Sequence, residues 1–345
     1  MSRKGGTRMA YDEEILRRAK QRFDAQRQER RATLESRRQN VYRRQPRIRA
    51  IDAELRKTSA RVLSAALRHG DPQQAVEQLR EKNLNLQAEK KSLLAQLRLP
   101  LDYLKDEPAC PVCRDSGYTD DGHMCWCLQK LCVQEQKKDL SKMLDLDNQS
   151  FENFSLDWYS DRTDRTQGIS PRKYMEHIYK ACLDYARKFG ANSGNLFFFG
   201  SSGLGKTFLS AAIAREVSAA GFSVVYDTAA NVFQRFEAER FSREATAGNE
   251  VNRVLHCDLL ILDDLSTDTP SQFMRNALYQ IVNTRLLEHR ATILSTNLEP
   301  TNLEKYSPQI ASRVQGEYEI FGFFGEDIRK LKRQYHGKPP YGKHP

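Results

Sequence analysis

The chain has 345 residues, of which 39% are hydrophobic and 29% are charged, and its formal net charge is +10. This length allows two or perhaps three domains. No apolar run approaches the roughly 18 residues of a membrane span, and the N-terminus "MSRKGGTRMAYDEE" lacks the apolar stretch of a signal peptide. These features exclude a membrane-embedded chain and predict a cytoplasmic protein, in which clustered cysteines are expected to bind metal or do redox chemistry.

The positive charge is concentrated in the N-terminal part of the chain. Residues 1–100 contain 25 Lys and Arg against 12 Asp and Glu, a net charge of +13, so the remaining residues sum to −3. A local basic excess suits nucleic acid or the acidic face of a protein partner.

The first hundred residues have the composition of long helices. Residues 10–44 are rich in the helix formers Arg, Gln, Glu and Ala. Narrow apolar stripes at helical spacing follow over 51–66 and 76–97, and "HGDP" at 69–72 predicts a break between them. We predict that 1–100 is a basic helical region, either a solvated spacer or a hairpin or bundle that docks onto a partner protein.

A short segment, "CPVCRDSGYTDDGHMCWC" at 110–127, holds four of the seven cysteines. The four candidate ligands are Cys110, Cys113, Cys125 and Cys127. Their spacing suits a tetrahedral Zn²⁺ site, with His123 or Cys132 as an alternative fourth ligand. A redox pair and unligated thiols are the other interpretations. Because the segment has few apolar residues, it needs the ion to fold, and we predict that 101–147 is a zinc-binding segment with a linker helix.

The second half of the chain has an α/β pattern, which starts near residue 171 after an aromatic-rich loop at 148–161. Four apolar strands are expected at "NLFFFG" (195–200), "FSVVYDTA" (222–229), "DLLILDDL" (258–265) and "ATILSTNL" (291–298). Helical segments alternate with these strands, which predicts a parallel sheet flanked by helices. The predicted domain is 148–335, and the last residues, 336–345, are expected to be a disordered tail.

A phosphate-binding loop is predicted at "GSSGLGKT", residues 200–207. The stretch fits G-x-x-x-x-G-K-[ST] and lies between an apolar strand and a helix, as a P-loop does. Backbone N–H groups and the helix N-terminus supply positive potential for phosphate oxygens. Lys206 should reach the β- and γ-phosphates of ATP, and Thr207 should ligate Mg²⁺. The residues expected to bind the nucleotide are Gly200, Ser201, Ser202, Gly203, Leu204, Gly205, Lys206, Thr207 and Phe208.

Two later strands end in polar residues that complete such a site. "LLILDD" places Asp263 to hold Mg²⁺ through water and Asp264 to orient or deprotonate the attacking water. Asn297 ends "TILSTN" and would lie beside the γ-phosphate if its strand sits between the other two. That strand order is typical of the additional-strand P-loop ATPases.

Two arginines follow these motifs. Arg313, in "PQIASRV", is expected to project into the nucleotide of a neighbouring subunit as an arginine finger. Arg329, in "FFGEDIRKLKRQ", opens a last helix that would fold back over the phosphates. Either residue alone is typical of a protein surface, and their order after the other motifs supports the assignment.

The ordered set "GSSGLGKT", "LLILDDL", "STN", "IASRV" and "GEDIR" resembles the AAA+ ATPases. More narrowly, it resembles the bacterial replicative helicase loaders of the DnaC/DnaI type. "SFENFSLDWYS" and "LPLDYL…CPVCRDSGY…CWC" are similar to the version found in Gram-positive bacteria and their phages, where a zinc-binding segment precedes the ATPase. The resemblance covers about residues 98–335.

The resemblance implies an ATP-dependent loader of a hexameric DnaB-type helicase onto single-stranded DNA, acting in the cytoplasm at the nucleoid. The helicase would bind the N-terminal region, and the AAA+ domains would self-assemble. Asn297 would be sensor 1, Arg313 the finger and Arg329 sensor 2. The chain departs from the pattern with Asp264 where most AAA+ proteins carry Glu, and with Ser266 where many relatives have Gly, which leaves the hydrolysis rate open.

Two other functions are compatible with the same core: a transposition helper ATPase of the IstB type, and an ATP-switched DNA-binding adaptor with negligible hydrolysis. Relatives use an element near "NVFQRFEAERFSRE" (231–244) to contact single strands. Its candidate DNA contacts are Phe233, Arg235, Phe236, Arg240 and Arg243. The alternative is an amphipathic helix packed on the sheet.

Overall fold

The computed structural model describes residues 11–66, 72–241, 249–265 and 270–341. The chain divides into two compact units, one of Gln21–Gly117 and the other of Met1–Lys20 with Tyr118–Pro345. Each unit is described by itself. Within the described ranges, no helix has both the length and the apolar character needed to cross a bilayer.

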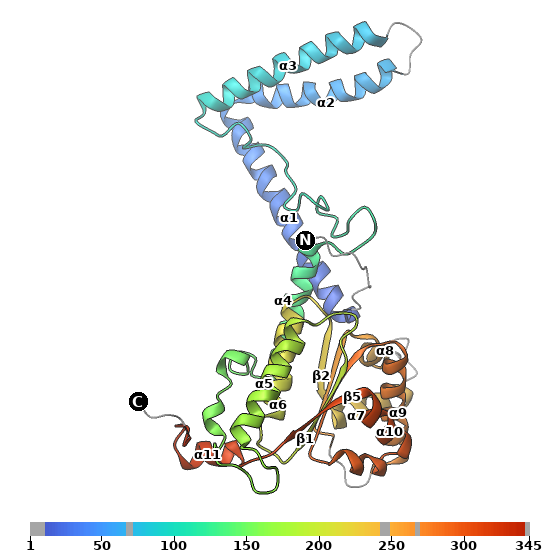
Figure 1. The fold of residues 1–345 in the computed structure, drawn as a ribbon. Coiled ribbons are helices and arrows are strands. Elements are labelled where there is room, and N and C mark those ends of the chain that lie inside the picture. Colours follow the sequence, from blue (N-terminus) through green and yellow to red (C-terminus); the bar gives the residue numbers. More distant parts are fainter. Residues whose placement is uncertain (1–10, 67–71, 242–248, 266–269, 342–345) are drawn as a thin grey trace. The chain divides into compact units, whose positions relative to one another are not determined.

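The unit of Gln21–Gly117 is helical, as predicted (Figure 1). Its helices are α1 (Glu13–Arg44, which begins in the other unit), α2 (Pro46–Ala66) and α3 (Pro72–Gln96). α2 and α3 lie side by side, and ion pairs such as Lys90 to Asp52, at 2.5 Å, join them. A small core is formed by Val41, Ile48, Leu94 and Leu104. Most of the break predicted at 69–72 falls outside the described residues, and α3 starts at Pro72.

The larger unit contains a five-stranded parallel sheet with the order β2-β3-β4-β1-β5. The strands are β1 (Asn195–Gly200), β2 (Val224–Thr228), β3 (Leu259–Asp263), β4 (Ala291–Thr296) and β5 (Tyr318–Phe323). β4 pairs with both β1 and β3, and its Ile293 is in register with Leu196 on one side and Ile261 on the other. The predicted order, with an extra strand between the P-loop strand and the acidic strand, is therefore confirmed.

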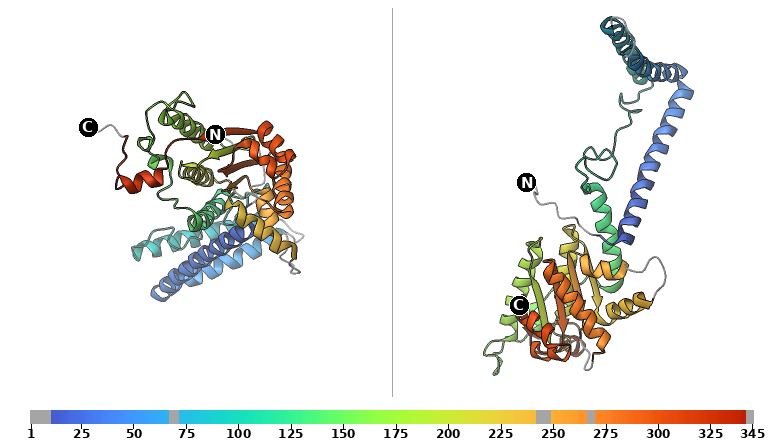
Figure 2. Two further views of the ribbon diagram at one scale, coloured as in Figure 1. Left: turned by 90° about the horizontal axis from the view of Figure 1, so that it is seen from below. Right: turned by 90° about the vertical axis from the view of Figure 1, so that its right-hand side faces the viewer.

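Helices cover both faces of this sheet (Figures 1 and 2). The helices of this unit, besides the start of α1, are α4 (Trp126–Met143), α5 (Pro171–Arg187), α6 (Lys206–Ala219), α7 (Ala229–Phe241), α8 (Asn249–His256), α9 (Gln272–Leu287), α10 (Pro308–Glu317) and α11 (Ile328–Gln334). Successive strand residues point to opposite faces, so Phe198 packs in one buried apolar cluster and Phe197 in another. The first cluster includes residues of α4, α5 and α6, and the second includes residues of α7 to α10.

Two features differ from the sequence predictions. The edge strand β5 was not predicted; it begins at Tyr318, directly after α10 ends at Glu317, and pairs along the whole of β1. In the region of the expected disordered tail, 336–345, the Tyr341 backbone N–H donates to the Asp157 carbonyl oxygen at 3.3 Å, a contact that the sequence did not suggest. Residues 342–345 lie outside the described residues.

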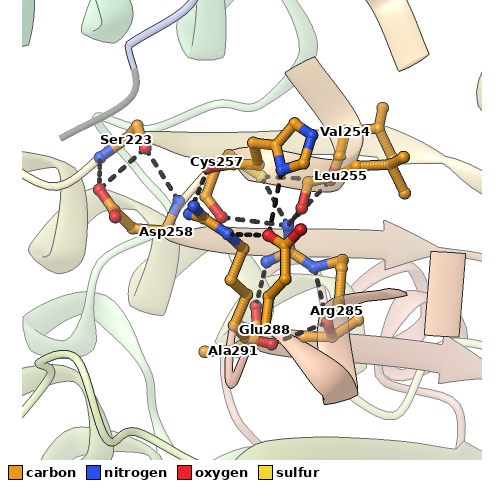
Figure 3. A network of polar contacts seen from close by, with 11 residues as sticks. Ser223, Val254, Leu255, Cys257, Asp258, Arg285, Glu288 and Ala291 are labelled. Carbon is orange, nitrogen blue, oxygen red and sulfur yellow. Dashed lines mark hydrogen bonds and ion pairs between the residues drawn. The ribbon is translucent and has the colours of Figure 1, made fainter. Parts of the chain in front are cut away.

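A buried arginine joins three elements on one side of the sheet (Figure 3). Arg285 of α9 has no exposed surface. Its guanidinium donates to carbonyl oxygens at the end of α8 and at the start of β4, and to one hydroxyl. These acceptors are Val254, Leu255, Cys257 and Ala291 through their carbonyls and Thr292 through Oγ1. The Arg285 guanidinium therefore supplies hydrogen-bond donors to carbonyl oxygens at the end of α8, which have no partner within the helix.

Candidate nucleotide-binding site

The predicted P-loop connects the end of β1 to the start of α6, and its glycines allow other chain segments to approach closely. Gly200 has φ 131°, and a Cβ there would lie 2.1 Å from the carbonyl oxygen of Phe323 in β5. Gly205, at φ 98°, precedes α6, and a Cβ there would lie 2.6 Å from the Tyr159 hydroxyl. Both positions combine a left-handed backbone with close contacts, so they require glycine.

Lys206 is the first residue of α6, and its ammonium group is held inside the loop. Nζ donates to the carbonyl oxygens of Gly200 at 2.6 Å and Ser201 at 2.9 Å, and to Asn297 Oδ1 at 2.9 Å. Burial lowers the pKa of Lys206, and the charges of Asp263 and Asp264 oppose that shift. The ammonium thus stands where P-loop lysines contact the terminal phosphates.

Asp263 ends β3 and is the centre of a buried hydrogen-bond cluster. Thr207 Oγ1 donates to Asp263 Oδ2 at 2.9 Å, and the hydroxyls of Tyr226 and Ser295 also donate to this carboxylate. Burial, followed by the Asp263 charge, raises the pKa of Tyr226. A carboxylate beside a threonine hydroxyl is a hard oxygen pair, which fits Mg²⁺.

Asp264 has a left-handed backbone with φ 55°. Its N–H donates to Asp263 Oδ1 at 3.1 Å and to Ser295 Oγ at 3.2 Å, which fixes the turn after β3. The residue is exposed and lines the same pocket as Lys206 and Asn297. These residues meet because the carboxyl ends of parallel strands share one edge of the sheet.

The two predicted arginines are placed differently. Arg329, in the first turn of α11, lines the pocket, and the preceding Ile328 N–H donates to the Gly203 carbonyl oxygen at 3.0 Å. Arg313 lies on α10 and does not line this pocket; its guanidinium carbon lies 5.9 Å from the centroid of the Tyr279 ring. The structure therefore brings together the predicted site residues except Arg313, which was expected to serve a neighbouring subunit.

The pocket, of about 560 Å³, has further walls that the motifs did not identify. One wall comes from the aromatic-rich loop, whose lining residues include Phe154, Trp158 and Tyr159. The Tyr159 hydroxyl donates to the Leu204 carbonyl oxygen at 3.0 Å and so fixes this loop against the P-loop. The concentration of aromatic residues in "SFENFSLDWYS" was the available signal.

Two of the candidate DNA contacts on α7, the phenylalanines, are corrected by the structure. Phe233 and Phe236 are 3% and 5% exposed and belong to the core, because they lie on the face of α7 that packs on the sheet. Arg235 pairs with Asp227. The side chains of Arg240 and Arg243 lie outside the described residues, as does Ser266.

The sulfur atoms of the four predicted zinc ligands all lie within 4.8 Å of one another. Cys110, Cys113 and Cys125 are buried and Cys127 is partly buried. Neither alternative ligand belongs to this group among the described residues. A set of four thiols is the donor set that structural zinc sites use.

The parallel sheet, the P-loop after β1, the acidic residues after β3 and the strand between them define an AAA+ ATP-binding domain. Residues 176–308, which are less than half of the chain, match the family model described as IstB-like ATP binding protein, so this part of the chain is similar to that family.

The replicative helicase loader DnaC of Escherichia coli (strain K12) is 30% identical over 141 residues, which are 41% of this chain and 56% of the relative. The chromosomal replication initiator protein DnaA of Aquifex aeolicus is 28% identical over 40% of this chain and 34% of the relative. The chain thus spans about half the length of the DnaC relatives it matches. A crystal structure of the DnaC helicase loader has 19% identity and a TM-score of 0.42, over 50% of this chain and 98% of that one.

Proposed function

We propose that this protein is an ATPase that loads a hexameric DnaB-type replicative helicase onto single-stranded DNA. The observation that carries the proposal is the convergence of Lys206, Asp263, Asp264 and Asn297 at one edge of the sheet. The similarity to the DnaC loader supports helicase loading as the purpose of that site.

In this proposal the chain's own groups prepare ATP for attack by water. Lys206 and the P-loop amides bind the phosphates, and Thr207 and Asp263 hold Mg²⁺, which neutralises the phosphate charge when bound. Asp264 orients the water. Arg329 approaches the phosphates from α11, and Arg313 acts on the nucleotide of an adjacent copy.

The test of hydrolysis is Asp264→Asn, which keeps the size and the tolerance of a left-handed backbone but removes the carboxylate. We expect the variant to bind ATP like the wild type, while its turnover with single-stranded DNA falls at least tenfold. Equally negligible turnover in the two proteins would favour the ATP-switched adaptor, and equally fast turnover would refute the role of Asp264.

The test of loading uses the full chain, the replicative helicase of the same organism and circular single-stranded DNA. We expect ATP-dependent recruitment of the helicase onto the circles, measured by gel filtration of the DNA complex. The match to the IstB-like model supports a transposition helper as the second candidate. No recruitment, together with DNA-dependent binding of a transposase, would favour that candidate.

We also propose that the four clustered cysteines hold one structural Zn²⁺, and that the helicase contacts the basic helical region of residues 1–100. In this proposal residues 101–147 are the zinc-binding segment with its linker helix, and residues 148–335 are the ATPase domain. Metal analysis of the purified protein should give about one ion per chain. A Cys110→Ser/Cys113→Ser variant with undiminished zinc would refute the site.

A further inference from the structure

The last described residue of the chain returns to the nucleotide-binding unit and contacts two separate segments. The Tyr341 backbone N–H donates to the carbonyl oxygen of Asp157 at 3.3 Å, and the Tyr341 hydroxyl donates to the carboxylate of Glu326. These partners are 184 and 15 residues away in the sequence. Tyr341 therefore joins a segment that precedes α5 to the segment that leads into α11.

Arg172, in the first turn of α5, strengthens this junction. Its guanidinium donates to the Tyr341 carbonyl oxygen, and its Nε donates to the Tyr159 carbonyl oxygen at 3.2 Å. Its Nη2 also lies 3.3 Å from the Asp157 carboxylate. One arginine thus binds the end of the chain and both sides of the turn around Trp158.

The two segments joined by Tyr341 each form a wall of the nucleotide pocket. Trp158 and Tyr159 directly follow Asp157, whereas Ile328 and Arg329 come soon after Glu326; all four line the pocket.

The two walls also meet directly. The ammonium of Lys332, on α11, lies 5.6 Å from the centroid of the Trp158 ring. The seven-residue helix α11 buries Leu331 but leaves Arg329 exposed. A helix this short is marginal by itself, so its position depends on tertiary contacts such as the buried Leu331 and the contacts of the segment that leads into it.

We propose that Tyr341 is a positioning residue that clamps the aromatic wall to α11 and so preorganises the pocket for nucleotide. The clamp touches neither the phosphates nor the P-loop. The clamp holds the two walls in place before the nucleotide binds. Less conformational entropy is then lost on binding, so the affinity is higher. The inference rests on the proposed ATP binding and adds a determinant outside the matched residues 176–308.

The experiment compares two chains that differ by one residue. One ends at Tyr341, which keeps the side chain and gives Arg172 a terminal carboxylate; the other ends at Pro340 and loses every clamp contact of residue 341. We expect the shorter chain to bind a fluorescent ATP analogue about five- to tenfold more weakly, measured by titration. Equal affinity of the two chains would overturn the clamp.

A second readout separates positioning from general stability. In a Trp126→Phe background Trp158 is the one remaining tryptophan, since the chain contains two. We expect a red-shifted Trp158 emission in the chain that ends at Pro340, with an unchanged thermal midpoint by circular dichroism. An unchanged emission spectrum, or an affinity loss that merely follows a lowered midpoint, would also overturn the clamp.

If the shorter chain does not fold, Tyr341→Phe in the full chain tests the clamp instead. This variant loses only the hydroxyl contact to Glu326, and we expect a two- to threefold weaker affinity, whereas wild-type affinity would contradict the clamp. Lys206→Ala is the control for phosphate binding. If the wild type binds the analogue no better than Lys206→Ala, the proposed ATP binding itself fails, and the clamp falls with it.

Discussion

The two units of the chain are stabilised by different kinds of contact. In the nucleotide-binding unit, strand residues such as Phe197, Phe198 and Ile293 are completely buried in apolar clusters on both faces of a sheet. In the unit of Gln21–Gly117, a small apolar core is accompanied by ion pairs between α2 and α3. Exposed ion pairs contribute little to stability, and apolar burial contributes most of it.

The difference suits the role proposed for each unit. Phosphate chemistry needs side chains held to within a fraction of an ångström, which a rigid sheet provides. A charged helical surface needs no such precision, since its charges act over several ångströms. We therefore expect substitutions in the nucleotide-binding unit to change chemistry or folding strongly. Substitutions in the unit of Gln21–Gly117 should have local effects.

The largest effect is expected from Arg285→Met, which leaves the carbonyl oxygens at the end of α8 buried without their donor. We expect a loss of about 3–5 kcal/mol in the free energy of unfolding, measured by urea denaturation. Arg275→Met is the control, because Arg275 is only half-buried on the same helix and its guanidinium donates to the Pro270 carbonyl oxygen and to Gln272 Oε1. Similar losses in both variants would show that burial of this charge is not decisive.

A smaller effect is expected from Ile48→Ala in the helical unit. Ile48 is completely buried in its core, so the substitution should cost about 2–5 kcal/mol there. We expect part of the helical circular dichroism signal to disappear at lower urea, while the ATP analogue still binds with wild-type affinity. Leu84→Ala, at a side chain that is 57% exposed on α3, is the matched control. Parallel loss of nucleotide binding would break the contrast between the units.

Tyr226→Phe should affect chemistry more than folding. It removes the hydroxyl that donates to Asp263 and leaves that carboxylate to Thr207 and Ser295. We expect about tenfold slower ATP turnover, equivalent to about 1.4 kcal/mol, with unchanged affinity for the ATP analogue. Tyr185→Phe, which loses a hydroxyl contact to the Gly194 carbonyl oxygen away from the pocket, should keep full turnover. Equal rates in both variants would argue against a role for the Asp263 cluster.

The smallest effect is expected from Asp52→Asn in the helical unit. Asp52 accepts from Lys90 Nζ at 2.5 Å and from the Tyr42 hydroxyl at 2.6 Å, and both contacts are partly buried. The expected loss is about 1 kcal/mol in low salt and less at high salt, because ions screen the pair. Urea unfolding at two salt concentrations measures it. If the loss in the free energy of unfolding is the same at both salt concentrations, Asp52 stabilises the unit by packing and not by its charge.

Four of the five strands and the core of the site could be predicted from the sequence, because both depend on local patterns, whereas the middle position of β4 was expected from the order typical of additional-strand P-loop ATPases. Apolar runs such as "LLILDD" mark buried strands, and their polar ends share one edge of a parallel sheet. Lys206, Asp263 and Asn297 could therefore be placed together before any contact was known.

Features that depend on distant contacts were not predictable in this way. β5 carries Glu319 and Gly322, and it follows a helix without an intervening turn, so its pattern resembles no buried strand. Phe233 and Phe236 have the spacing of a helix face, and only the tertiary structure shows that this face is buried. The contact between Tyr341 and Asp157 joins residues that are 184 positions apart in the sequence.

The left-handed backbone of Asp264 has a consequence for how this position can change over evolutionary time. Aspartate and asparagine adopt such a conformation more readily than residues with longer side chains. Replacing Asp264 with glutamate would extend the acid toward the phosphates but would place a less tolerant residue in a tight turn. Glycine would relax the turn and remove the acid. The tight turn and a longer-reaching acid therefore favour different residues at this position.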